Sequence, residues 1–162
     1  MKYNYRVTKY DPQYRDAHGV YTRDEWYLFT QVGQTFEDGT LSLEEYERVE
    51  SNYIRVALQF MEEAGVTRLQ ALDVQADPAD GPAEGQFLPI AAIGNQLRGM
   101  LREQCWFRLE EGPTYIHIGW DFYMYIGVPV RCAWTKEAAL QAGLFVEDMA
   151  SPYAMCTDDE AL

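Results

Sequence analysis

Apolar and polar residues alternate along three consecutive stretches in the second half of the chain, the pattern of half-buried β-strands. The stretches cover residues 106–110, 114–120 and 122–128. β-branched and aromatic residues are frequent in all three, as they are in strands generally. A Glu-Gly-Pro turn separates the first two, and a tight reversal near Asp121 separates the last two. We therefore expect three strands joined by short turns.

The two faces of these strands differ in composition. One face is aliphatic and aromatic and is expected to pack in the core; it carries Thr114, Ile116, Ile118, Trp120, Phe122, Met124, Ile126 and Val128. The opposite face carries Tyr115, His117, Tyr123 and Tyr125. This second face is polar enough to be partly in contact with solvent.

The clearest helix is predicted for residues 42–64. Apolar residues recur there at steps of three and four, so that one stripe faces the core. Ser42 and Glu45 fit a capping box, in which a hydroxyl and a carboxylate satisfy the free amides of the first turn. Gly65 is the residue type expected just after a helix end.

Weaker patterns predict the remaining elements. Further strands are expected at residues 2–9, 25–30, 67–75 and 144–147. Further helices are expected at 88–103 and at 136–142, the latter capped by Thr135 and closed by Gly143. Residues 77–85 are rich in Pro, Gly, Ala and acidic residues, and we expect a mobile loop there.

This order of elements predicts an α+β fold. A mostly antiparallel sheet would be covered on one face by the two longer helices, with one short helix in addition. The length of 162 residues favours a single domain over residues 1–155. Residues 156–162 are expected to form a frayed acidic tail.

Composition places the chain among soluble cytoplasmic proteins. It contains no run of about 18 apolar residues that would span a bilayer. Its first ten residues alternate in polarity, unlike a signal peptide. The three cysteines are odd in number and widely spaced, which favours reduced thiols over a disulfide framework.

The charge balance is strongly acidic and uneven. The chain has 13 basic and 26 acidic side chains, for a net charge of −13. Residues 36–72 sum to −5, 73–86 to −4 and 143–162 to −5, whereas the other segments are close to neutral. Such a chain should repel nucleic acid and anionic lipid. It should attract a basic protein surface.

Signatures of catalysis are absent from the sequence. It has no Gly-rich phosphate loop, no HExxH, no GxSxG and no CxxC pair. A nucleophilic pair of Cys105 or Cys132 with His117 is one alternative. A core or interface histidine, hydrogen-bonded to a tyrosine, is the interpretation that we prefer. We expect no catalytic residues, no metal and no cofactor.

Three stretches resemble a known group of proteins: KYNYRVTKYDPQYRD at the start, YMYIGVP at 123–129, and GLFVE at 143–147 followed by SPY at 151–153. They are similar to small acidic immunity proteins of bacterial polymorphic toxin systems (contact-dependent, Rhs or type VI). The resemblance implies a cytoplasmic inhibitor that binds its cognate toxin without chemistry. The resemblance does not identify any binding residue in this chain.

We therefore predict a non-catalytic protein that binds a basic partner, a cognate toxin domain, through carboxylates and aromatic anchors. The expected contributors are Glu44, Glu47, Asp77, Asp80, Glu84, Trp120, Asp121 and Tyr123. Asp121 is otherwise simply a turn residue. Base stacking by Trp120, Tyr123 and Tyr125 is disfavoured without a basic groove. One alternative is an enzyme or small-ligand binder with a sheet–helix pocket near His117, and another is a structural subunit of an assembly.

Overall fold

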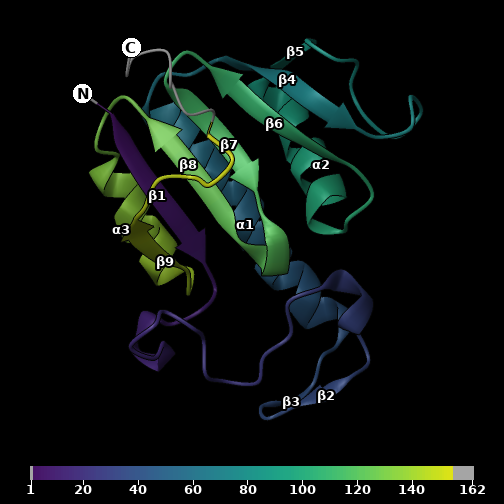
Figure 1. The fold of residues 1–162 in the computed structure, drawn as a ribbon, viewed down its shortest axis with the longest axis vertical. Helices are drawn as coiled ribbons and strands as arrows, with labels where there is room; N and C mark the ends of the chain where they lie inside the picture. Colours follow the sequence, from purple (N-terminus) through teal and green to yellow (C-terminus); the bar gives the residue numbers. More distant parts are fainter. Residues whose placement is uncertain (1, 155–162) are drawn as a thin grey trace.

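An antiparallel seven-stranded sheet organises the part of the chain that this computed structural model describes, residues 2–154 (Figure 1). The strand order is β5-β4-β6-β7-β8-β1-β9. The strands are β1 (Tyr3–Thr8), β4 (Arg68–Gln75), β5 (Phe87–Pro89), β6 (Trp106–Glu111), β7 (Thr114–Ile118), β8 (Met124–Val128) and β9 (Phe145–Asp148). The α+β prediction is thus confirmed.

The other elements of the described chain are helices, short turns and one small hairpin. The helices are α1 (Leu43–Glu63), α2 (Ile90–Leu101) and α3 (Ala133–Gln141). The single 3-10 turns are η1 (Pro12–Tyr14), η2 (Phe29–Gln31) and η3 (Trp120–Phe122). The hairpin pairs β2 (Thr35–Phe36) with β3 (Gly39–Thr40).

Helix α1 begins and ends where its sequence signals lie. The Ser42 hydroxyl accepts a hydrogen bond from the Glu45 amide at 3.0 Å, as an N-cap does. The Glu45 carboxylate binds Arg48 rather than the Ser42 amide, so only half of the predicted capping box forms. Gly65 has a φ of +73°, a left-handed conformation that glycine adopts without a steric penalty. In the apolar stripe between them, Tyr46, Tyr53 and Phe60 are fully buried, whereas Leu43 in the first turn is exposed. The helix prediction is confirmed.

The α-helices lie on one face of the sheet, and the core lies between them and the strands (Figure 1). Phe107, Ile116 and Ile126 point into this core from β6, β7 and β8. Helix α2 is joined to α1 by Glu50, whose side chain is only 1% exposed. Glu50 accepts hydrogen bonds from Arg98 and Arg102 on α2 and from Tyr46 on its own helix.

The helix-free face of the sheet is covered instead by the chain that follows β9. This segment, drawn yellow, crosses β7 and β8 in Figure 1. Its Ser151 bonds to His117, and its Tyr153 packs against Tyr125. Tyr115, His117 and Tyr125 are consequently buried. The expectation that this face is partly in contact with solvent was therefore wrong for these three residues, and only Tyr123 of the four is half-buried.

Residues 25–30 form no strand, contrary to our prediction. Trp26 and Phe29 pack their rings on Tyr46 of α1, which draws the segment away from the sheet. Both edges of β1 are also occupied, by β8 and β9. The segment ends in the 3-10 turn η2.

Two helix starts also differ from our prediction. The expected helix at 88–103 begins only at Ile90, because the residues just before it pair with β4 as strand β5. Helix α3 begins at Ala133, before the Thr135 cap that we expected. Cys132 precedes it in a left-handed conformation, with a φ of 55°. No residue type near Cys132 announces that turn.

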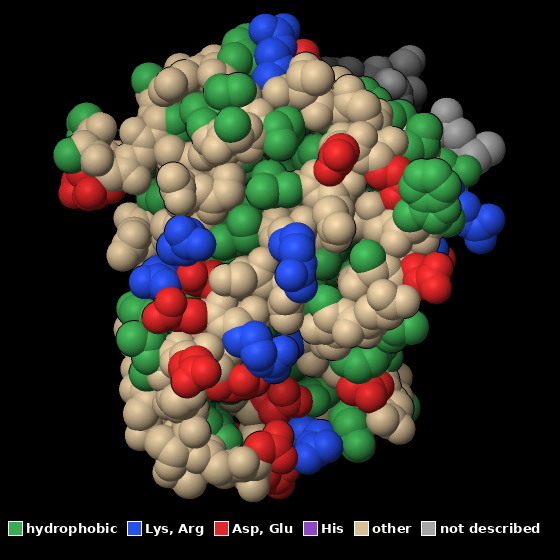
Figure 2. All heavy atoms as spheres, turned by 180° about the vertical axis from the view of Figure 1, so that it is seen from behind, with side chains coloured by type: hydrophobic (Ala, Val, Ile, Leu, Met, Phe, Trp, Pro, Cys, Tyr) green, Lys and Arg blue, Asp and Glu red, His purple; other side chains and the backbone are tan. Residues whose placement is uncertain are grey.

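The helix-covered face has a charged lower end (Figure 2). Asp and Glu side chains gather there together with Lys and Arg side chains, and the loop between β4 and β5 projects at the upper left of the same view.

None of the helices within residues 2–154 has both the length and the apolarity needed to cross a bilayer. The predicted tail at 156–162 lies outside the described residues.

Candidate partner-binding sites

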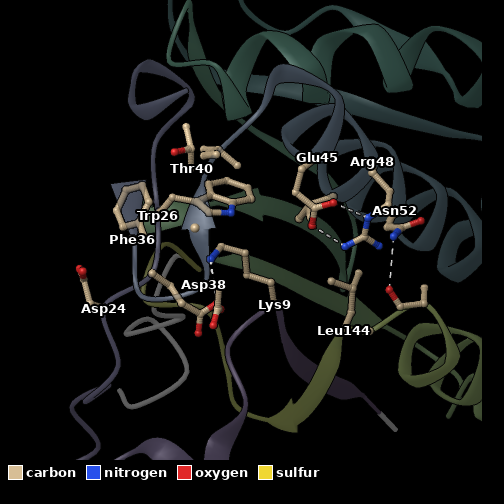
Figure 3. Close-up of a pocket in the computed structure, with 16 residues that line it drawn as sticks. Lys9, Asp24, Trp26, Phe36, Asp38, Thr40, Glu45, Arg48, Asn52 and Leu144 are labelled. Atoms are coloured by element: carbon tan, nitrogen blue, oxygen red, sulfur yellow. Dashed lines mark hydrogen bonds and ion pairs between the residues drawn. The ribbon is translucent and has the colours of Figure 1, made fainter. Parts of the chain in front are cut away.

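A cleft of about 340 Å³ opens where the first turns of α1 face the loop after β1 and the β2–β3 hairpin (Figure 3). We call it the acidic cleft. Its charged lining residues are Lys9, Asp24, Glu25, Asp38, Glu45 and Arg48. Four carboxylates and two cations give these side chains a net charge of −2. The cleft therefore favours a positively charged occupant.

Lys9 forms an internal contact of the cleft. Its ammonium lies 3.3 Å from Glu25 Oε1 and 4.3 Å from each of the ring centroids of Tyr10 and Trp26. Burial lowers the pKa of Lys9 to about 8, although the Glu25 carboxylate acts to raise it. Tyr21 donates a hydrogen bond to the other oxygen of Glu25. Both charges of the Lys9–Glu25 pair are thus used within the fold.

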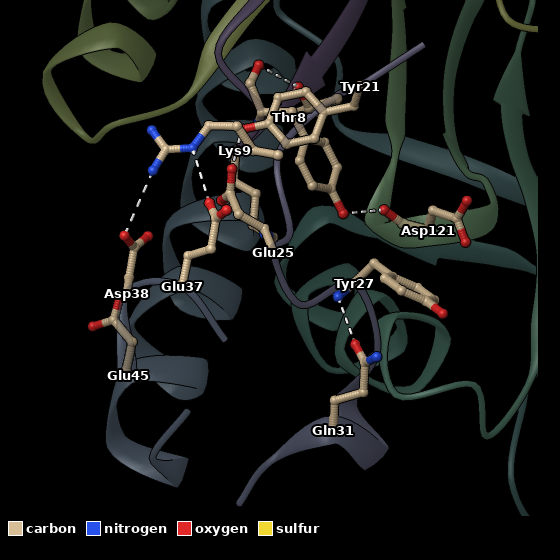
Figure 4. Close-up of polar contacts among 12 residues, drawn as sticks. Thr8, Lys9, Tyr21, Glu25, Tyr27, Gln31, Glu37, Asp38, Glu45 and Asp121 are labelled. Carbon is tan, nitrogen blue, oxygen red and sulfur yellow. Dashed lines mark hydrogen bonds and ion pairs between the residues drawn. The ribbon is translucent and has the colours of Figure 1, made fainter. Parts of the chain in front are cut away.

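The rim of the cleft combines paired and unpaired carboxylates. Arg48 holds Glu45 by two hydrogen bonds, of 2.9 and 2.7 Å, and these lower the pKa of that carboxyl group. Arg23 approaches Glu37 and Asp38 only at 3.8 and 3.7 Å (Figure 4). No side-chain hydrogen bond or ion pair within residues 2–154 involves Asp24. Asp24 is therefore available to a partner.

A second cavity, of about 420 Å³, lies beside the β7–β8 turn. We call it the aromatic pocket. Its apolar walls are Met100, Cys105, Trp106, Ile118, Trp120 and Tyr153. The Trp106 indole N–H donates to the Ile118 carbonyl at 2.7 Å, and the Trp106 and Tyr153 ring centroids are 5.5 Å apart. Trp120, which we expected to pack in the core, is 76% exposed, because β7 ends at Ile118 and Trp120 lies in the turn η3; Trp106 is partly covered.

The predicted binding residues fall into separate groups. Glu44 and Glu47 are exposed near the start of α1 but do not line the acidic cleft, and Trp120 lines the aromatic pocket. Asp77 and Asp80 are exposed in the loop between β4 and β5. The charge of Asp80 acts with burial to raise the pKa of the Cys105 thiol, so this loop lies near the aromatic pocket.

Three of the predicted residues also make contacts within the fold. Glu84 accepts hydrogen bonds from the Asp73 and Val74 amides, at 3.0 and 2.9 Å. Asp121 adopts a left-handed conformation in η3, and its backbone carbonyl accepts a 2.6 Å hydrogen bond from Tyr10. Tyr123 is half-buried; it packs against the Tyr10 ring and accepts a hydrogen bond from Arg15. The eight residues do not form one continuous patch.

His117 does not line a pocket between sheet and helices, which corrects our expectation. It lies on the helix-free face, with its ring stacked on Tyr115 at a centroid distance of 4.4 Å. Its Nδ1 is 2.7 Å from Ser151 Oγ, and its Nε2 is 3.1 Å from Glu110 Oε2. Tyr115 also accepts a hydrogen bond from the Ser151 amide at 3.2 Å.

The order Ser151–His117–Glu110 resembles a hydrolytic triad, but its environment is that of a structural contact. His117 is 0% exposed, and Ser151 Oγ also accepts a hydrogen bond from the Tyr153 amide at 3.0 Å. Neither side chain lines the acidic cleft or the aromatic pocket. The network therefore fastens the segment after β9 to the sheet.

Of the cysteines within residues 2–154, neither Cys105 nor Cys132 contacts this histidine. The Cys132 thiol donates to the Phe60 carbonyl at 3.7 Å on the core side, and burial raises its pKa to about 11. Cys105 lines the aromatic pocket. Within residues 2–154, no group of three or more His, Cys, Asp and Glu side chains is arranged to hold a metal ion.

Our sequence reasoning missed the cleft residues Lys9, Asp24, Trp26, Asp38 and Glu45, as well as Glu103 of the aromatic pocket. The only sequence signal for the cleft was the acidic run between residues 37 and 47. Comparison with protein-family models, with curated proteins and with solved structures found no match for this chain.

Proposed function

We propose that this chain is a non-catalytic immunity protein, which binds the basic surface of a cognate bacterial toxin domain in the cytoplasm and neutralises it. The observation that carries the proposal is the acidic cleft, where the chain's negative charge meets a concave surface. The resemblance of three sequence stretches to immunity proteins supports the same function.

Charge at the cleft would act chiefly on the rate of association. Carboxylates around a concave surface attract a basic partner over several ångströms and orient it before contact. Salt screens this attraction beyond about 8 Å at physiological ionic strength. Asp24 and Asp38 are exposed in the cleft lining and add to this field, whereas the charge of Glu25 is balanced by Lys9.

The test uses the toxin domain encoded beside this chain. The variant D24N/D38N/E45Q removes three carboxylate charges from the cleft lining, and the control E62Q/E137Q/D148N removes three exposed charges elsewhere. Glu62 lies near the far end of α1, which is about 30 Å long for its 21 residues. We expect the cleft variant to associate at least about tenfold more slowly in low salt, and the control to change little.

Two results would count against this function. The first is failure of the unmodified chain to relieve the toxicity of the neighbouring domain on co-expression. The second is an association rate that falls equally in both triple variants, because the charge effect would then be global and the cleft would have no special part.

The alternative, an enzyme or small-ligand binder that uses His117, has weaker support. Both ring nitrogens of His117 already have partners, and the side chain is fully buried. Turnover of a small molecule that is lost in H117Q while the variant stays folded would favour this alternative.

A further inference from the structure

Trp120 is held in solvent by a turn that contains two residues with unfavourable backbone conformations. Asp121 and Phe122 both adopt left-handed backbone conformations, with φ values of 60° and 65°. Phe122 is buried against Tyr46 and Tyr53, and this packing anchors the turn. Neighbouring strained residues next to an exposed tryptophan are typical of a functional site, since neither feature stabilises the fold.

The neighbouring walls present further aromatic surface. Trp106 is fixed by the hydrogen bond from its indole N–H to the Ile118 carbonyl, and Tyr153 packs beside the Trp106 ring. Met100 and Ile118 complete the apolar lining. A flat group with an apolar stem would therefore be in contact with aromatic faces on more than one side.

The lining of the aromatic pocket also includes a negatively charged side chain but no positively charged one. Glu103 is the ionisable carboxylate among its lining residues, and no Lys or Arg lines it. Glu103 is exposed, its φ is 60°, and no side-chain hydrogen bond or ion pair within the described chain uses its carboxylate. The side-chain oxygens of Gln75 and Gln104 add hydrogen-bond acceptors. Aromatic faces beside a free carboxylate attract a cation.

We propose that the aromatic pocket binds an arginine side chain of the protein partner, with its guanidinium stacked on Trp120 and hydrogen-bonded to Glu103. This inference rests on the proposed binding function and adds the chemistry of one anchor. Arginine fits better than lysine because its guanidinium is planar, stacks on aromatic rings and donates a fork of hydrogen bonds to a carboxylate. The acidic cleft then accelerates the encounter, and this pocket slows dissociation.

The first test of this inference needs no toxin. The full chain is titrated with N-acetyl-arginine-N-methylamide, and the four tryptophan indole N–H signals are followed by NMR. N-acetyl-citrulline-N-methylamide is the matched neutral probe, and the lysine analogue is the matched cation without a planar head. We expect saturable shifts with a Kd of about 1–10 mM for arginine, and at least about tenfold weaker binding of citrulline.

Variants assign the site. W120A should abolish the saturable shifts, and E103Q should weaken arginine binding about fivefold or more without changing citrulline binding. W134A is the matched control, because Trp134 is 81% exposed on α3, outside the pocket. The spectrum of each variant also reports whether it is folded.

The inference is overturned if citrulline binds as well as arginine, if lysine binds as tightly, or if W134A rather than W120A removes binding. It is also overturned if W120A and E103Q neutralise the toxin with an unchanged dissociation rate. Arginine binding by a chain that does not protect against the toxin would instead refute the proposed function alone.

Discussion

The two faces of the sheet are buried in different ways. The helix-covered face is filled by aliphatic and aromatic side chains, such as Phe107 and Ile116, which need only apolar neighbours. The helix-free face is buried by a short segment and contains Arg108, Glu110 and His117. Each of these groups needs a matching partner, because an unpaired buried polar group is costly.

This difference predicts where each face is vulnerable. Apolar contacts are non-directional, so that the first face loses stability in proportion to the volume removed. The second face depends on a connected network in which Asn4, Tyr115, Ser151, His117 and Glu110 follow one another by hydrogen bonds. Small changes of position should disturb several of these bonds together.

The largest loss of stability is expected from a substitution on the helix-covered face. Phe107→Ala should lower the free energy of unfolding by about 3–5 kcal/mol, because the fully buried ring would leave a cavity. Urea denaturation followed by circular dichroism measures this loss. Leu140→Ala on the exposed surface of α3 is the matched control and should cost less than about 0.5 kcal/mol. Similar costs for the two substitutions would refute this picture of the core.

A smaller loss of stability, which depends on one ring contact, is expected from a substitution at Gly127. A Cβ there would overlap the Tyr115 ring, which covers this glycine on the helix-free face. Gly127→Ala should cost about 1–3 kcal/mol, because the ring must move and its 2.7 Å hydrogen bond to Asn4 must break. In a Tyr115→Ala background the same change should cost much less. Equal costs in both backgrounds would exclude the ring contact as the cause.

The smallest effect is the pH dependence that His117 confers on stability. Burial lowers its pKa below the ordinary 6.5, although the Glu110 carboxylate acts to raise it. Below about pH 6.5 the unfolded chain therefore binds more protons at this position than the folded chain. The free energy of unfolding consequently decreases as the pH is lowered.

His117→Gln removes this titration and keeps a donor and an acceptor. We therefore expect the variant to lose less stability than the unmodified chain between pH 7.5 and 5.5. Thermal unfolding across this range is the measurement. Parallel losses in both proteins would assign the pH dependence to other groups, with Glu110 the first to be examined.

Periodic patterns predicted the long elements well. Helix α1 and the three strands β6, β7 and β8 were evident, because burial of one face imposes a period on the residues themselves. The two-residue strands of the hairpin before α1 and the three-residue β5 were missed. Elements of that length are too short to show a period, and their pairing depends on what else occupies the sheet edge.

The candidate sites were predicted only in part. The sequence located the acidic segments and the turn at Trp120, because residue type and turn position can be seen without a structure. It could not show that Lys9 balances Glu25, or that Glu84 caps two amides. Those pairings join residues that are 16 and about 10 positions apart, across irregular loops.

The sequence by itself determined the α+β composition, the principal helix and the overall negative charge of this protein. These follow from residue identity and local periodicity, which need no knowledge of distant contacts. Tertiary structure alone decided the strand order, the burial of His117 beneath Ser151, and the assembly of Trp106, Trp120 and Glu103 around one pocket. Each of these depends on the meeting of distant segments, and the free energy of such contacts belongs to the folded chain as a whole.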